Sequence, residues 1–170
     1  TEALISLSTG WNWIGYTPQG SLGINTALSN IGPDNATYIK SQSGFADYYS
    51  GYGWYGQLSD MDPFLGYQIY MVNEDDFTYP EGGGLVMASN GYKQDDRFSN
   101  LSWEVNPHDY EFNGSATIQV ALDGEILNSD KYQLIAIDEN NKCVGSTRSY
   151  KFPLTDSYVF GLMMYNNKEY

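Results

Sequence analysis

Short stretches in which apolar and polar residues alternate make up much of the first half of the chain and predict β-strands. The predicted strands cover residues 3–16 (two strands around a turn at Thr9-Gly10), 36–42, 66–72 and 77–80. The expected core residues of the first pair are Leu4, Trp11, Trp13 and Ile14. Trp11 and Trp13 are two positions apart and share one side of a strand. They either pack in the core, which we expect, or form an exposed platform.

Residues 21–31 follow the period of a helix instead. Ile24, Leu28 and Ile31 recur at the spacing i, i+4, i+7, which predicts one apolar helix face. Ser21 is placed to cap this helix, and Gly32-Pro33 is a typical helix end. The first half is therefore expected to be α+β, with one short helix beside several strands.

A run of three glycines at 82–84 marks the predicted boundary between two domains, residues 1–81 and 85–170. In the second domain, strands are predicted at 101–106, 116–122, 132–137, 142–148 and 158–165, with turns at 123–124 and 138–141. Short strands at regular spacing with almost no helix predict an antiparallel β-sandwich, with Trp103 in its core. The whole chain is expected to be mainly β.

The stretch 44–56 carries six aromatic side chains among glycines. Flat rings with polar edges suit a surface that stacks on a ligand, and pyranose sugars offer matching apolar C–H faces. The predicted ligand-binding residues are Asp47, Tyr49, Tyr52, Trp54, Tyr55 and Gln57. The alternative is an aromatic core beneath a glycine-rich loop, and Trp54 is the ring that fits this alternative best.

The chain of 170 residues is acidic, with a net charge of −13 and only 8 Lys and Arg residues. Nucleic acids and anionic membrane surfaces are not expected as partners, because they are bound by clustered cations. Membrane insertion is not expected, since no apolar run approaches the roughly 20 residues that span a bilayer. The single cysteine, Cys143, cannot form an intrachain disulfide and is expected to be a buried small apolar residue.

The residue types offer little for catalysis or metal binding. His108 is the sole histidine, so an ordinary zinc or copper site is excluded, and no Gly-x-Ser-x-Gly motif accompanies it. We expect His108 to be exposed in a turn, assign no catalytic residue, and do not expect an enzyme. No cofactor is expected, although calcium stays possible at loop acids, for which solvated turns are the favoured explanation. These acids are Asp60, Asp62, Glu74, Asp75, Asp76, Asp95 and Asp96.

Two sets of motifs carry a resemblance to known modules. The first set is 10–16 (GWNWIGY), 39–46 (IKSQSGFA), 53–56 (GWYG) and 66–67 (GY). The second set is 103–107 (WEVNP), 109–110 (DY), 116–123 (ATIQVALD), 134–136 (LIA), 144–145 (VG) and 162–166 (LMMYN). The first half resembles a GWNW-type repeat of large secreted surface proteins from gut and marine Gram-negative bacteria. The second half resembles the β-module that often accompanies this repeat.

The resemblance implies an accessory module of a secreted, extracellular or cell-surface protein, and it brings no catalytic residues. In the family, a further strand-rich segment follows the run at 165–167, whereas this chain ends at Tyr170. The resemblance therefore implies one of two alternatives: the second domain is truncated at its C-terminus, or its last strands come from elsewhere.

Together, these observations predict a non-catalytic carbohydrate-binding module whose aromatic residues stack on a polysaccharide or other glycan. The alternative is a structural or adhesive module that binds another surface protein, because tyrosine-rich surfaces also recognise proteins. Exposed aromatics in a groove would favour sugar, a broad flat patch would favour protein, and buried aromatics would leave only scaffolding. A close pair of carboxylates in a cleft would instead indicate a glycosidase.

Overall fold

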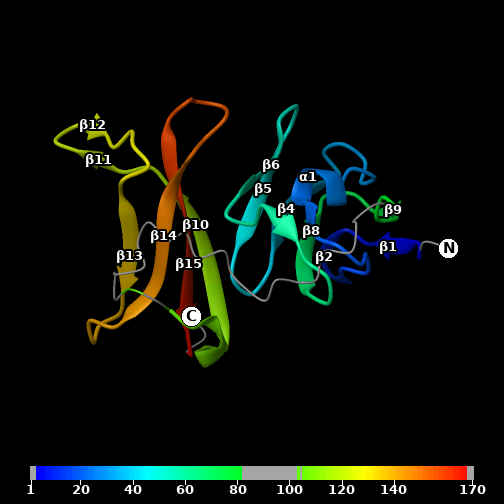
Figure 1. Ribbon diagram of the computed structural model, residues 1–170, viewed down its shortest axis with the longest axis horizontal. Helices are drawn as coiled ribbons and strands as arrows, with labels where there is room; N and C mark the ends of the chain where they lie inside the picture. The colour runs from blue at the N-terminus through cyan, green and yellow to red at the C-terminus, as the bar shows by residue number, and fades with distance from the viewer. Residues whose placement is uncertain (1–2, 82–102, 104, 168–170) are drawn as a thin grey trace. The chain divides into compact units, whose positions relative to one another are not determined.

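The computed structural model describes residues 3–81, 103 and 105–167. The chain divides into two compact units, residues 1–90 and 91–170 (Figure 1). Strands dominate the described part of both units, and the α-helix found there is four residues long. The prediction of a mainly-β fold is therefore confirmed. The predicted boundary at 82–84 lies outside the described residues.

A five-stranded antiparallel sheet forms the body of the first unit. In spatial order its strands are β2 (Gly10–Gly15), β8 (Gly66–Met71), β4 (Ala36–Lys40), β5 (Phe45–Tyr49) and β6 (Gly53–Gly56). Two further pairs are β1 (Ile5–Leu7) with β9 (Asp75–Phe77), and β3 (Leu22–Gly23) with β7 (Asp60–Met61). The strands predicted at 3–16, 36–42 and 66–72 are confirmed, whereas the strand predicted at 77–80 lies earlier, in β9.

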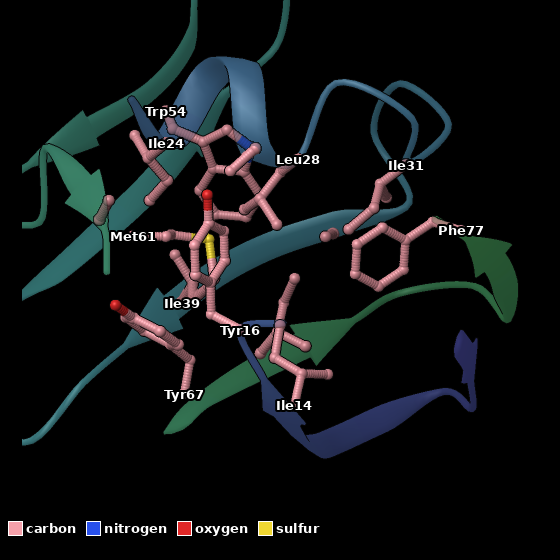
Figure 2. Packing of buried hydrophobic residues seen from close by; sticks show 14 of the residues in the cluster. Ile14, Tyr16, Ile24, Leu28, Ile31, Ile39, Trp54, Met61, Tyr67 and Phe77 are labelled. Atoms are coloured by element: carbon pink, nitrogen blue, oxygen red, sulfur yellow. The ribbon is translucent and has the colours of Figure 1, made fainter. Parts of the chain in front are cut away.

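The two faces of this sheet differ in burial, because side chains alternate between the faces along each strand. Ile39 and Ile69 are paired on the inner face and have no exposed surface. They belong to a core that also includes side chains of helix α1 (Ile24–Ala27). Figure 2 shows Trp54 close to Ile24 in this core. The buried rings and aliphatic chains thus hold the helix to the sheet.

The helix is shorter than predicted, and of its predicted apolar face only Ile24 lies within it, although all three residues are buried. The buried residues of that face are Ile24, Leu28 and Ile31. Ser21 does not cap the helix, because its hydroxyl donates a hydrogen bond to the carboxylate of Asp62 and the two following residues form β3. Pairing of β3 with β7 therefore overrides the local preference for a longer helix.

The predicted core of the first strand pair is wrong for three of its four residues. Ile14 is buried, but Trp11 is 55% exposed, Trp13 is 79% exposed and Leu4 is exposed as well. Trp11 and Trp13 alternate with Ile14 along β2, so only one set can face the core. Ile14 pairs with the buried Tyr67 of β8, and this pairing directs both tryptophans outward.

The second unit contains a four-stranded antiparallel sheet. In spatial order its strands are β10 (Phe112–Ile118), β15 (Tyr158–Asn166), β14 (Cys143–Lys151) and β13 (Gln133–Ile137). A hairpin of β11 (Ala121–Leu122) and β12 (Glu125–Ile126) turns at Asp123 and Gly124, which both have positive φ. Two positive φ values are typical of a type I′ turn, so the predicted turn is confirmed.

Of the other predictions for the second unit, some are confirmed and some are wrong. The described residues of the predicted strand at 101–106 do not form a strand, and Trp103 is exposed rather than buried in a core. His108 is exposed in a 3₁₀ turn (Pro107–Asp109), as expected, whereas Cys143 is only half-buried. The β-sandwich stays a prediction, because the described residues show one four-stranded sheet and a small hairpin.

Three tyrosines of the first unit share a buried environment. The rings of Tyr16 and Tyr79 meet edge to face with centroids 4.9 Å apart, and the Tyr16 hydroxyl donates to the carbonyl of Gly20 at 2.8 Å. Burial raises the pKa of Tyr16 to about 12, with smaller contributions from Tyr67 and Asp62. Burial likewise raises the pKa of Tyr67 and of Tyr79. The fold therefore holds these phenols in their neutral form.

These pKa shifts predict a loss of stability in alkaline solution. The folded pKa of Tyr16 lies above its ordinary value of 10.0, so its contribution is fully present below pH 10 and is lost as pH rises through about 12. Tyr16→Phe should make the free energy of unfolding fall less steeply with pH in this range, as measured by urea denaturation. Tyr52→Phe, at an exposed turn position, serves as the control. Equal slopes in the wild type and Tyr16→Phe would contradict the assignment.

The outer edge of β6 is covered by a side chain of α1. The Asn25 side chain accepts a hydrogen bond from the backbone N–H of Trp54 at 2.7 Å and donates one to its carbonyl at 3.1 Å. A neighbouring strand would make the same two bonds to Trp54. Asn25 therefore closes this edge and ties the helix to the sheet.

Removal of this amide is expected to destabilise the first unit. Asn25→Ala should lower the free energy of unfolding by about 1–3 kcal/mol, because two partly buried backbone groups lose their partners. Thr26→Ala, at the next and exposed helix position, should change it by less than about 0.5 kcal/mol. Chemical denaturation of both variants measures the difference. Similar losses in the two variants would show that the Asn25 bonds contribute nothing of their own.

Candidate functional site

The predicted ligand-binding residues lie along the hairpin of β5 and β6, and most of them reach the surface. Asp47 pairs with Tyr55 across the two strands, and the rings of Tyr49 and Tyr55 have centroids 6.5 Å apart. Tyr52 is exposed in the connecting turn, and Gln57 is exposed just after β6. The structure thus brings Asp47, Tyr49 and Tyr55 together on the outer face. Burial raises the pKa of the Tyr49 phenol, and the charge of Asp47 adds to this effect.

Trp54 is not on this surface. It is 5% exposed, and its ring packs edge to face against Tyr48 with centroids 5.3 Å apart. Tyr48 and Trp54 are paired on the inner face, opposite to the face of Asp47 and Tyr55. The place of Trp54 in a stacking surface is therefore a wrong prediction, and its structural alternative holds.

The outer face continues from the hairpin across all five strands as a row of paired residues. One residue from each strand takes part, and the register runs Trp11, Tyr70, Tyr38, Asp47, Tyr55. Adjacent strands lie about 4.8 Å apart, so the row extends over about 19 Å. Four of the five members are aromatic. The site is therefore larger than the predicted cluster and includes residues far apart in the sequence.

A second row lies beside the first, one pleat along the strands. Its register runs Trp13, Gln68, Lys40, Phe45. Trp13 is the most exposed member, whereas Phe45 is buried under Tyr38, whose ring stacks on it with centroids 5.7 Å apart. Beyond Trp13, the next outward pair is Gly15 and Gly66, which adds no side chains. This end of the face is therefore open beside the indole.

Trp11 is held by its neighbours from three sides. Its ring meets Tyr70 at 74° and Tyr38 at 87°, with centroids 5.3 Å and 5.8 Å away. The ammonium group of Lys40 lies over the ring, 5.5 Å from its centroid. Because these rings are nearly perpendicular, the surface of the face is uneven rather than flat. Burial also lowers the pKa of Lys40.

The charge of the face differs from that of the rest of the first unit. Residues 1–81 contain nine Asp and Glu residues but one cation, Lys40. Lys40 lies on the outer face with Asp47, in the strand next to it. The aromatic rows therefore carry one group of each sign together with the amide of Gln68. Such a set can donate and accept hydrogen bonds between apolar rings.

Two of the loop acids, Asp75 and Asp60, accept hydrogen bonds from neighbouring groups of the protein. Asp75 accepts hydrogen bonds from the Gly32 N–H at 2.7 Å and from the Asn35 amide at 3.1 Å, and these bonds lower its pKa. Asp60 accepts a bond from the hydroxyl of Ser59 at 2.6 Å. No group of three or more His, Cys, Asp and Glu side chains suited to a metal occurs among the described residues. Asp95 and Asp96 lie outside them, and the alternative of a calcium site at the loop acids stays untested.

The spacing of residues in the sequence could have indicated the part of this face that lies on β2, β4 and β8. Trp11 and Trp13 recur with period two, as do Tyr38 with Lys40 and Gln68 with Tyr70. Such spacing places each pair on one side of its strand. It does not reveal which side faces the core, and that is where the prediction for the tryptophans failed.

Comparison of the chain with family models, with curated proteins and with solved structures finds no match. The resemblance to the GWNW-type repeat and its accompanying module therefore stays a prediction. Within the described ranges, no helix is long and apolar enough to cross a bilayer.

Proposed function

We propose that the first unit is a non-catalytic carbohydrate-binding module and that the glycan lies on the outer face of its five-stranded sheet. The observation that carries this proposal is the row of paired aromatic residues that crosses all five strands. Rings stack on the C–H faces of sugars, while the intervening Asp47, Lys40 and Gln68 offer partners for hydroxyl groups. An exposed face of this kind would bind weakly and without chemical change.

Sheet stability alone accounts for only part of the aromatic content. Cross-strand aromatic pairs such as Trp11 with Tyr70 do stabilise a sheet. However, Trp13 leaves 79% of its surface in solvent, so most of its ring contributes nothing to packing. Large exposed rings beside other rings are typical of interaction surfaces. A ligand therefore explains Trp13 better than the fold does.

The uneven shape and the polar side chains of the outer face favour a sugar over a protein partner. The near-perpendicular rings around Trp11 break up a flat patch, and polar side chains are interleaved with the rings. A protein interface core is usually depleted of charged residues, whereas this face carries both Lys40 and Asp47. A structural or adhesive module that binds another surface protein is the second candidate, since Tyr and Trp also dominate protein-binding hot spots. Both candidates fit a secreted or cell-surface protein, which we propose as its setting.

A polysaccharide panel tests the proposal on the whole chain. We expect the protein to be retarded in native gels that contain a neutral polysaccharide (xyloglucan, galactomannan or hydroxyethyl cellulose). The double variant Trp11→Ala/Trp13→Ala should bind at least about tenfold more weakly, because both tryptophans of the face are lost. Parallel lanes with and without calcium show whether the ion takes part.

Trp103→Ala is the matched control, because it removes an exposed tryptophan of the second unit. It should leave retardation unchanged, and thermal unfolding should confirm that all variants stay folded. Absence of retardation in every gel would contradict binding of the protein to these classes of polysaccharide. The second candidate, a module that binds another protein, would then be favoured.

A further inference from the structure

We infer, building on the proposed function, that Trp13 rather than Trp11 is the ring on which a neutral sugar stacks. The two tryptophans belong to one strand and one face, yet their surroundings differ. Trp11 is wedged between Tyr38 and Tyr70, and the ammonium of Lys40 lies over its ring. Trp13 is 79% exposed. The second arrangement leaves more of the indole open to a ligand than the first, in which 55% of Trp11 is exposed.

Access to Trp13 is kept open by the glycine pair beside it. Gly15 follows Trp13 by two positions, so it lies on the same face of β2, and it pairs with Gly66 of β8. A Cβ atom built on Gly15 meets nothing within 4 Å, and one built on Gly66 meets only the carbonyl oxygen of Ile14 at 4.0 Å. Each glycine therefore leaves a space that an ordinary side chain would fill.

Backbone geometry does not require glycine at either position. The positive-φ glycines of the first unit are Gly10, Gly51 and Gly53 in its described part, and neither Gly15 nor Gly66 is among them. Glycine in a strand is costly, because it gives up packing and chain entropy. In strands it often marks a bulge, a tight bend, or a place where a ligand or another backbone approaches closely. Here the exposed indole and the bare backbone meet at one end of the sheet face.

The charge of the unit indicates that the ligand is uncharged. The only cation of residues 1–81 is Lys40, which is engaged with Trp11, against nine acidic residues. An anionic sugar at Trp13 would meet net repulsion without a free cation close by. The amide of Gln68, paired with Trp13 across the strands, can both donate to and accept from sugar hydroxyl groups. The occupant that fits is a neutral pyranose unit.

Single substitutions separate the roles of the two tryptophans. Binding to xyloglucan, galactomannan and hydroxyethyl cellulose is measured by affinity gel electrophoresis, with polygalacturonate as the anionic comparison. Trp13→Ala should weaken binding by at least about tenfold, whereas Trp11→Phe should weaken it by less than about threefold. Gly15→Thr and Gly66→Thr should abolish most retardation while keeping the thermal midpoint. Gly114→Thr in the other unit, also a strand glycine with nothing within 4 Å of a built Cβ, should bind as the wild type does.

The possible binding results distinguish the role of Trp13, the charge of the ligand and the proposed function. Loss of binding in Trp13→Ala and in both glycine variants supports the inference. Wild-type binding by Gly15→Thr and Gly66→Thr, or equal losses in Trp13→Ala and Trp11→Phe, would overturn it while the proposed function stands. Stronger binding to polygalacturonate than to the neutral polymers would overturn the neutral ligand. No binding by the wild type would overturn both proposals. If a threonine variant unfolds, Gly66→Ala and Gly15→Ala provide the milder version of the same test.

Discussion

The antiparallel register of β2, β8 and β4 is the constraint on which the first unit depends. Ile69 of β8 is buried between Asn12 of β2 and Ile39 of β4, while the residues before and after it face solvent. A shift of one residue in this pairing would exchange the two faces, since side chains alternate strictly. The free-energy cost of exposing Ile39 and Ile69 therefore fixes the outward position of the rings on these three strands, which are Trp11, Trp13, Tyr38 and Tyr70. Core packing and surface chemistry are two results of one register.

Much of the local structure was predictable because it depends on near neighbours in the sequence. The turn at Asp123-Gly124 follows from the ability of these residues to adopt positive φ, and the buried positions Ile24, Leu28 and Ile31 follow from their spacing. The helix length was not predictable in the same way. The pairing of β3 with β7, whose residues are distant in sequence, sets where the helix begins.

The outer aromatic face was harder to predict, because it joins strands that are far apart along the chain. Trp13 and Ile14 are adjacent large apolar residues, and only one of them can point inward. The sequence alone does not choose between them, because cores accept both side chains. The choice is made by Tyr67, which is buried opposite Ile14. Local aromatic density led instead to Trp54, a ring that the inner face needs for packing.

The amide of Asn25 makes the two long edges of the sheet unequal. By bonding to both backbone groups of Trp54, a single side chain stands in for a sixth strand. Unpaired edge strands can template the addition of other chains, and proteins commonly block them. At Trp54, Asn25 therefore occupies the backbone groups that an added strand would need, in the same strand that carries Tyr55 to the outer face.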